Sequence, residues 1–300
     1  MWCAIAIAAA ALSVPAGLRE ASPFGGRVGP TFNLLDFGAK GDNATLNTRC
    51  FEKGVAAVAA AGGGTLYVPD GVFITAPFNM TSHMTLFLSG GATVRAPTTA
   101  QLGPSPAFPL WPIIPPMPSY GQGRDHPGPR RTSLVHGENL TDVTVTSHPD
   151  AWGTIDGNGA PWWAAHELHT ETVTRGHLIE FIFCVGIEIS NLRLRNSPFW
   201  TVHPVYSRSV VVRNIDIKNP HDSPNTDGVD PESSQDVLIE NFTYEGGDDV
   251  IAIKSGWGPP DRAHPARAEP EGERAAAGYR APEQPTGTAR RYNLISGAFN

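Results

Sequence analysis

IEISNLRLRN (187–196), VVVRNIDIKN (210–219) and VLIENFTYEG (237–246) are three segments of the sequence that can be laid over one another. Each is a short β-rich run, an asparagine, and a second alternating run. A rougher copy, LTDVTVTS, lies at 140–147. A repeat of roughly 20–30 residues with short strands and no helix between them predicts a solenoid.

The asparagine shared by the three copies, at Asn191, Asn214 and Asn241, points to one kind of solenoid. In a parallel β-helix, strands of successive coils stack about 4.8 Å apart. An asparagine can form a tight corner there, because it tolerates unusual φ and can hydrogen-bond its own copy in the next coil. The frame of leucine-rich repeats is absent, and a β-sandwich with chance spacing is the alternative. We therefore predict an all-β protein, a right-handed parallel β-helix.

The rest of the chain divides around this solenoid. The apolar start, residues 1–17, is typical of a signal peptide, although it lacks a basic first region. Residues 18–257 would form the β-helix domain. Within it, Thr45–Ala61 has helical spacing of apolar residues and is expected to be a short N-terminal capping helix. The Pro- and Gly-rich residues 103–131 are expected to be a long surface loop.

Composition limits the classes of function. The chain has 300 residues, 40% hydrophobic and 17% charged, with a net charge of −7. These values are typical of a globular protein, and the lack of a basic run argues against a nucleic-acid partner. No apolar stretch reaches the roughly 18 residues of a membrane span. Four sequons, listed by their asparagines, would permit glycosylation in a secretory compartment: Asn43, Asn79, Asn139 and Asn241.

Cysteines say little about the fold. Cys3 would leave with the signal peptide, and Cys50 and Cys184 remain. We expect two small buried thiols rather than one disulfide. The chain has no CxxC and no His/Cys cluster with zinc spacing, so neither a structural metal nor another cofactor is expected.

Aspartates occur one repeat apart in the last copies. Asp227 in NTDG is followed 21 and 22 residues later by Asp248 and Asp249 in GGDD. In a β-helix these residues would be neighbours on adjacent coils. Like charges that close raise the pKa of at least one carboxyl. A protonated acid beside an ionised base is what glycoside hydrolysis requires.

Two other interpretations of these aspartates remain open. Asn, Asp and Gly are common in turns, so both motifs could be turns without chemistry. Alternatively, Asp227, Asp230, Asp248 and Asp249 could bind calcium, although the chain lacks an Asp-x-Asp-x-Asn-Gly loop.

The sequence resembles the polygalacturonases of glycoside hydrolase family 28, in their plant-like branch, over roughly residues 32–258. The segments that carry the resemblance are FNLLDFGAKGDNATLNT, AGGGTLYVPDGVFIT, GTIDGNGAPWW, HLIEFIFCVGIEISNLRLRNSPFWTVHPVYS, SPNTDGVDPESS and GGDDVIAIKSGWG. The resemblance implies a secreted, metal-independent hydrolase of α-1,4-linked galacturonan (pectin) that acts with inversion in the extracellular cell wall.

On the matching positions, the resemblance implies that Asp248 is the general acid and that Asp227 and Asp249 activate water. Lys254 is the nearest basic residue able to bind a substrate carboxylate. A sugar-facing role is considered for Trp200 and His203, whereas Trp162–Trp163 are expected to pack mainly in the core and on the coil surface. We expect a monomer with pectin as its partner.

The sequence departs from this family after residue 257. The family's Gly-His-Gly and Arg-Ile-Lys segments are absent, and His264 lies among Pro and Arg. From Gly258 to Asn293 there is no Val, Ile, Leu, Met or Phe, so residues 258–300 are expected to be a disordered, low-complexity tail. We therefore expect weak or no hydrolase activity from this chain. A non-catalytic β-helix that binds wall polysaccharide is the alternative; a pectate lyase is disfavoured because no Arg lies beside the aspartates.

Overall fold

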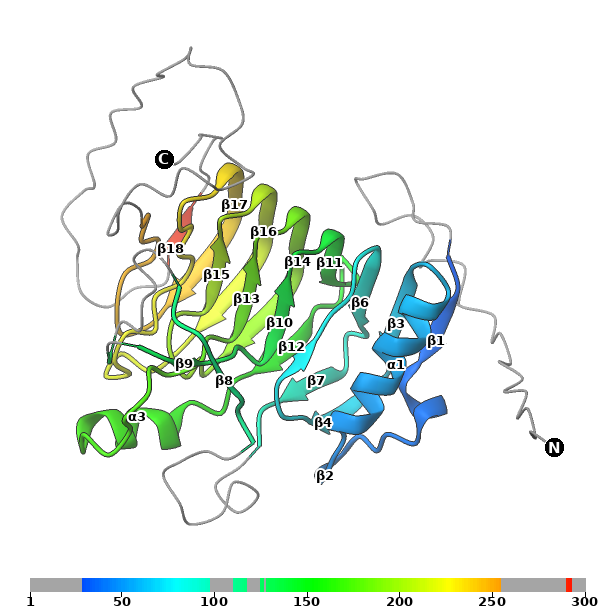
Figure 1. Ribbon diagram of the computed structural model, residues 1–300, viewed down its shortest axis with the longest axis horizontal. Coiled ribbons are helices and arrows are strands. Elements are labelled where there is room, and N and C mark those ends of the chain that lie inside the picture. The colour runs from blue at the N-terminus through cyan, green and yellow to red at the C-terminus, as the bar shows by residue number, and fades with distance from the viewer. Residues whose placement is uncertain (1–28, 98–109, 118–124, 127, 255–289, 293–300) are drawn as a thin grey trace.

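The computed structural model describes residues 29–97, 110–117, 125–126, 128–254 and 290–292. They form a stack of parallel strands that runs from β1 to β17 (Figure 1). The fold is the predicted right-handed parallel β-helix, since successive strands pair in parallel with neighbours one coil away. The β-sandwich alternative is wrong, because sandwiches are built from antiparallel strands.

Three long strands form the most regular part of the stack. These are β14 (Val185–Arg195), β16 (Arg208–Lys218) and β17 (Gln235–Glu245). Their register places Ile187 opposite Val210 and Val210 opposite Val237. This is the alignment that the sequence repeat predicts.

The repeated asparagines are the corners of these coils. Asn191, Asn214 and Asn241 have φ values of 55°, 52° and 46°, in the left-handed region that asparagine tolerates better than most residues. The Asn214 side-chain amide donates to Asn191 Oδ1 at 2.9 Å, and the Asn241 amide donates to Asn214 Oδ1. The predicted ladder of amides between coils is therefore confirmed.

This corner also changes which residues face the core. In β14, Ile187 and Ile189 are buried before the asparagine, and Leu192 and Leu194 are buried after it. An unbroken strand would keep every second residue on the same face. The left-handed asparagine shifts the alternation by one residue, so both arms of the bent strand bury their apolar side chains.

The remaining strands complete a twelve-stranded and a four-stranded sheet, and a third sheet of two strands is described below. The twelve-stranded sheet also contains β1 (Thr31–Asn33), β2 (Asp42–Leu46), β3 (Gly64–Val68), β4 (Gly71–Ile74), β6 (Met84–Leu88), β7 (Ala92–Arg95), β11 (Thr141–Ser147), β12 (Gly153–Asp156) and β18 (Arg290–Tyr292). The four-stranded sheet contains β5 (Phe78–Asn79), β10 (Val135–Glu138), β13 (Ile179–Ile182) and β15 (Val202–Val205).

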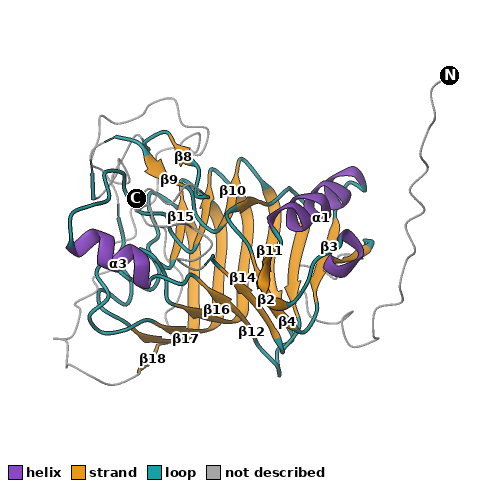
Figure 2. Ribbon diagram, turned by 90° about the horizontal axis from the view of Figure 1, so that it is seen from below, coloured by secondary structure: helices purple, strands orange, loops and turns teal. Residues whose placement is uncertain are grey.

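The helix α1 (Thr48–Ala60) covers the N-terminal end of the stack, as predicted (Figure 2). Phe51 and Val58 are buried against the first coils, and Gly54 lies so close to the Leu66 side chain that a Cβ would clash. The predicted start at Thr45 is wrong, because Asp42–Leu46 pairs with β4 as β2. Leu46 is 43% exposed and therefore takes no part in the apolar face of the helix.

A second helix, α3 (Ala160–Glu167), was not predicted. It lies at the opposite end of the stack from α1 (Figures 1 and 2). Trp162 on this helix packs edge-on against Trp111, with ring centroids 5.0 Å apart, and both rings are buried. The expected core role of Trp162 is confirmed, whereas Trp111 belongs to a segment that was expected to be a surface loop.

In that segment, Ile113–Ile114 (β8) pairs antiparallel with Arg130–Arg131 (β9). The described part of residues 103–131 is thus partly strand and partly core. The predicted signal peptide lies outside the described residues. Of the predicted tail, the structure describes only β18, which pairs antiparallel with β17.

Cys50 and Cys184 are free thiols, so no disulfide joins them. Cys184 is buried and Cys50 is half-buried. Within the described ranges, neither helix is long and apolar enough to cross a bilayer. The asparagines of all four sequons, Asn43, Asn79, Asn139 and Asn241, are exposed.

Candidate active site

Three aspartates meet on the surface of the last coils. Asp227, Asp248 and Asp249 each present a carboxylate oxygen, and these three oxygens lie within 4.8 Å of one another. The Gly228 amide donates to the Asp249 carbonyl at 2.9 Å, which places the NTD and DD segments side by side on adjacent coils. The predicted proximity of residues one repeat apart is confirmed.

The three carboxyls differ in their surroundings. Asp227 is 4% exposed, whereas Asp248 and Asp249 are exposed to solvent. Asn225 reaches over from the NTD segment, and its side-chain amide donates to Asp248 Oδ2 at 3.4 Å. The site therefore has one buried acid at its base and two solvated acids above it.

Tyr244 on β17 holds the two acidic segments at this spacing. Its hydroxyl lies 3.1 Å from the Thr226 carbonyl and 2.9 Å from the Asp248 carbonyl, and it accepts a hydrogen bond from the Asp248 amide at 3.2 Å. Burial raises the pKa of this phenol, so the hydroxyl keeps its proton as a donor. Gly247 allows the two acidic segments to pack this closely, because a Cβ at residue 247 would lie 2.0 Å from the Ser223 carbonyl oxygen.

Lys254 lies beneath the acids rather than beside a substrate position. It is 8% exposed, and its ammonium donates to Asp230 Oδ1 and, at 3.4 Å, to Asp227 Oδ2. The same ammonium lies 4.1 Å from the centroid of the Trp200 ring, a cation–π distance. The expectation that Lys254 binds a substrate carboxylate is therefore wrong in this structure, because the charge is already used by two aspartates.

Burial sets the pKa values of this lower layer. Burial raises the pKa of Asp227; the Lys254 charge lowers it and the Asp248 charge raises it again. Burial, followed by repulsion from Asp227, raises the pKa of Asp230 well above its usual range. A raised pKa within the acidic cluster was predicted from like charges, and the structure shows that burial is the larger cause.

Trp200 and His203 were considered as sugar-facing residues, and their burial contradicts that role. Trp200 is 2% exposed and His203 is 0% exposed. The Trp200 ring stacks on His177, with centroids 5.2 Å apart, and meets His203 edge-on at 5.0 Å. Trp200 packs behind the acids and supports Lys254 from inside the coil, and His203 packs against Trp200.

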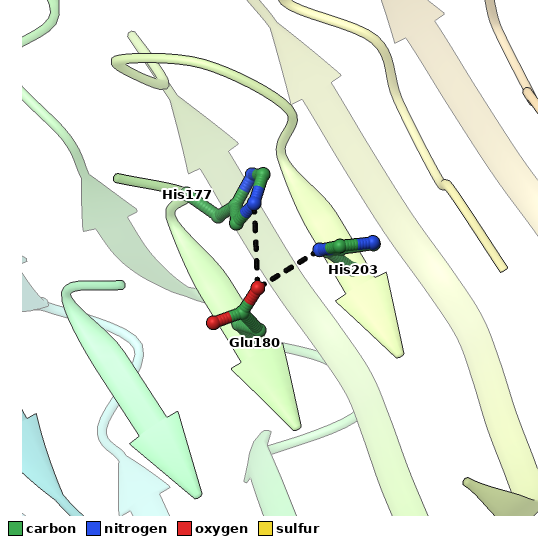
Figure 3. A group of neighbouring side chains, drawn as sticks. All are labelled: His177, Glu180 and His203. Atoms are coloured by element: carbon green, nitrogen blue, oxygen red, sulfur yellow. Dashed lines mark hydrogen bonds and ion pairs between the residues drawn. The ribbon is translucent and has the colours of Figure 1, made fainter. Parts of the chain in front are cut away.

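Behind Trp200 lies a buried chain of charged groups that connects three coils. His203 lies between two carboxylates, with Nδ1 2.9 Å from Glu180 Oε1 and Nε2 2.9 Å from Glu232 Oε2. His177 Nε2 approaches the same Glu180 oxygen at 3.3 Å, as Figure 3 shows. Arg130 Nη1 donates to both oxygens of Glu180, at 2.7 and 2.9 Å.

His177, Glu180 and His203 also have the donor atoms of a metal site. His203 is hydrogen-bonded directly to Glu180, His177 Nε2 lies 3.3 Å from the same carboxylate, and Arg130 already neutralises Glu180. A metal would have to displace those hydrogen bonds next to a guanidinium charge, which is unfavourable. The group is therefore interpreted as a hydrogen-bond network.

Of the four acids of the calcium alternative, Asp227, Asp248 and Asp249 present oxygens within 4.8 Å of one another. The Lys254 ammonium already contacts the other acid, Asp230, and also Asp227, and its charge opposes a cation there.

Arg175 is a further site residue that the sequence analysis missed. Its guanidinium pairs with Asp125 at 2.8 Å and donates to the Pro224 carbonyl at 2.9 Å and to Asn225 Oδ1 at 2.8 Å. It therefore fixes the turn that carries Asn225 toward Asp248. Glu180 was missed too, although a lone acid inside the apolar run HLIEFIF was a visible signal for a buried ion pair.

The fold and the site together define a parallel β-helix with an acidic cluster of the kind that glycoside hydrolysis uses. Residues 65–259 match the family described as glycosyl hydrolases family 28. Since this match covers more than half of the chain, the protein belongs to that family.

The chain is 46% identical over 228 residues to a "Probable polygalacturonase" of Vitis vinifera, an alignment that covers 75% of this chain and 44% of the relative. It is 29% identical over 228 residues to "Probable polygalacturonase At3g15720" of Arabidopsis thaliana, covering 75% of this chain and 43% of that one. The chain thus spans less than half the length of these curated relatives.

Among solved structures, an exopolygalacturonase from Thermotoga maritima is similar, with a TM-score of 0.61 and 27% identity over 75% of this chain and 55% of that one. A polygalacturonase from Erwinia carotovora has a TM-score of 0.56 at 23% identity, covering 72% of this chain and 57% of that one. The second likeness supports the fold alone.

Proposed function

We propose that this chain carries the catalytic acids of a secreted polygalacturonase-type glycosidase that hydrolyses α-1,4-galacturonosyl linkages of pectin in the cell wall, with the weak activity expected above. The observation that carries the proposal is the cluster of Asp227, Asp248 and Asp249 within 4.8 Å on adjacent coils. It is supported by membership of glycosyl hydrolases family 28 and by the 46% identity to a probable polygalacturonase.

The exposure of the three acids suggests their roles. Asp248 is exposed and held by Asn225, which positions its carboxyl to reach the leaving glycosidic oxygen as the general acid. Asp227 has a raised pKa, which makes its carboxylate a stronger base toward water. Asp249 faces the same volume and would bind the attacking water from the other side.

The separation of the acids bears on the stereochemistry. Their nearest oxygens lie within 4.8 Å, which is closer than the roughly 6.5–9.5 Å that usually separates the two carboxyls of an inverting glycosidase. Inversion at this spacing requires a water held between Asp227 and Asp249 to attack the face of the sugar opposite the oxygen that Asp248 protonates. Proton NMR of the first-formed anomer decides between inversion and retention.

Reducing-end release from polygalacturonate by the purified secreted chain tests the proposal. Asp248→Asn and Asp227→Asn should each lower the rate by about 10²–10⁴-fold, the usual contribution of a general acid or base. Asp150→Asn, on a side chain that is 91% exposed, is the control and should leave the rate unchanged. Binding of pectin with no cleavage by any variant would instead identify a non-catalytic polysaccharide-binding β-helix.

A further inference from the structure

A second acid, Asp230, lies directly beneath the candidate active site. It is fully buried, three residues after Asp227, and both carboxylates contact the Lys254 ammonium. Two carboxylates and one ammonium do not balance if both acids are ionised. An uncompensated buried negative charge is costly.

The hydrogen bonds show where the imbalance lies. Lys254 uses Asp227 Oδ2 and Asp230 Oδ1. The other oxygens, Asp227 Oδ1 and Asp230 Oδ2, are buried and receive no hydrogen bond within the described residues. An ionised carboxylate only accepts, but a protonated carboxyl also donates. One retained proton would therefore satisfy both oxygens, with one acid donating to the other.

Asp230 is the better holder of that proton. It is 0% exposed, whereas Asp227 is 4% exposed and faces the solvated Asp248 and Asp249. Burial raises the pKa of both acids, and it raises the pKa of the fully buried Asp230 well above its usual range.

The other charged and titratable groups around the pair are few. Tyr244 approaches from β17 and keeps its proton. On the far side of Trp200, Glu180 and Glu232 are engaged by His203, and His177 approaches Glu180. Lys254 therefore remains the cation that contacts both acids.

We propose that Asp230 is a positioning residue that stays neutral, donates its carboxyl proton to Asp227 Oδ1, and with Lys254 on Oδ2 fixes the plane of the Asp227 carboxylate. Each Asp227 oxygen keeps a lone pair for the water. The role of Asp227 as base rests on the proposed function, but the protonation of Asp230 does not.

The isosteric variant Asp230→Asn tests the hydrogen bond, because an amide donates and accepts from the same positions as a neutral carboxyl. It should keep hydrolysis within about threefold of wild type. Asp230→Ala removes the donor and should lower kcat by about ten- to a hundredfold, with KM little changed. An Asp230→Asn variant as impaired as Asp230→Ala would show that Asp230 acts as a charge and would overturn the proposal.

Infrared spectroscopy of the full chain labelled with ¹³C-aspartate gives a readout independent of activity. At neutral pH the wild type should show the C=O stretch of a neutral aspartic acid. That band should vanish in Asp230→Asn and persist in the exposed control Asp150→Asn. Absence of the band in wild type, or its persistence in Asp230→Asn, refutes a neutral Asp230. If wild type releases no reducing ends, the proposed function fails while the band still decides this inference.

Discussion

Replacing Asn214 by alanine tests whether the corner ladder stabilises the coils. The change removes two side-chain hydrogen bonds, one to Asn191 and one from Asn241, worth about 1 kcal/mol each at half-buried positions. The change also places an alanine in the left-handed backbone region, at φ 52°. This conformation costs an alanine about 1–2 kcal/mol, because it lacks the local hydrogen bonds of asparagine. The free energy of unfolding should therefore fall by about 3–4 kcal/mol.

Thermal and urea denaturation measure this loss. For a domain of this size, 1 kcal/mol shifts Tm by about 2–4 °C, so Asn214→Ala should lower Tm by about 6–16 °C. Asn214→Gly loses the same hydrogen bonds but accepts the left-handed backbone, so it should be about 1 kcal/mol more stable than the alanine variant. Glu240→Ala, at an ordinary half-buried position of β17, is the control.

Two outcomes would contradict this explanation of the corners. An Asn214→Ala variant as stable as Glu240→Ala would mean that the ladder contributes nothing measurable. A glycine variant less stable than the alanine variant would mean that the positive φ is not a cost that asparagine relieves. A double variant with Asn241→Ala should lose less than the sum of the single losses, because the two share one hydrogen bond.

Two other predictions concern the site's support. Burial lowers the pKa of His203, but its hydrogen bonds to Glu180 and Glu232 raise it overall. The protonated His203 therefore stabilises the folded protein fully below the unfolded pKa of about 6.5, and this contribution is lost as the pH rises through the higher folded pKa. Urea midpoints should thus show the advantage of wild type over His203→Gln shrinking from pH 6 to 9; an advantage that grows would oppose this sign. Gly247→Ala places a Cβ 2.0 Å from the Ser223 carbonyl, so calorimetry should show about 1–3 kcal/mol of lost stability; an unchanged Tm would contradict the packing.

Part of the site could be predicted from sequence because of the solenoid's geometry. In a β-helix, a fixed number of residues returns the chain to the same place one coil further, so spacing along the chain becomes distance in space. The spacing of Asp227 and Asp249 along the chain is therefore enough to predict that they are neighbours, as the structure shows. The same logic set the register of β14, β16 and β17, where a recurring asparagine marked each corner.

The sequence failed where a local pattern competes with distant partners. Leu46 fits the helical spacing of the residues after it, yet pairing with β4 takes Asp42–Leu46 into a strand. Helix α3 is only eight residues long, and its aromatic pair gives no clear period. Its Trp162 is fixed by Trp111, 51 positions earlier in the chain, through a contact that no local pattern encodes.

The sequence by itself determined the solenoid, its register and the meeting of three acids, because those depend on a repeat length and on which side chains are apolar. Only the tertiary structure decided what each polar group does. The residue types of Lys254 and Trp200 do not reveal whether their side chains face a substrate or the interior, and the structure shows that both are buried. Burial and the partners within reach assign Lys254 to Asp227 and Asp230, and those depend on how neighbouring coils close around the site.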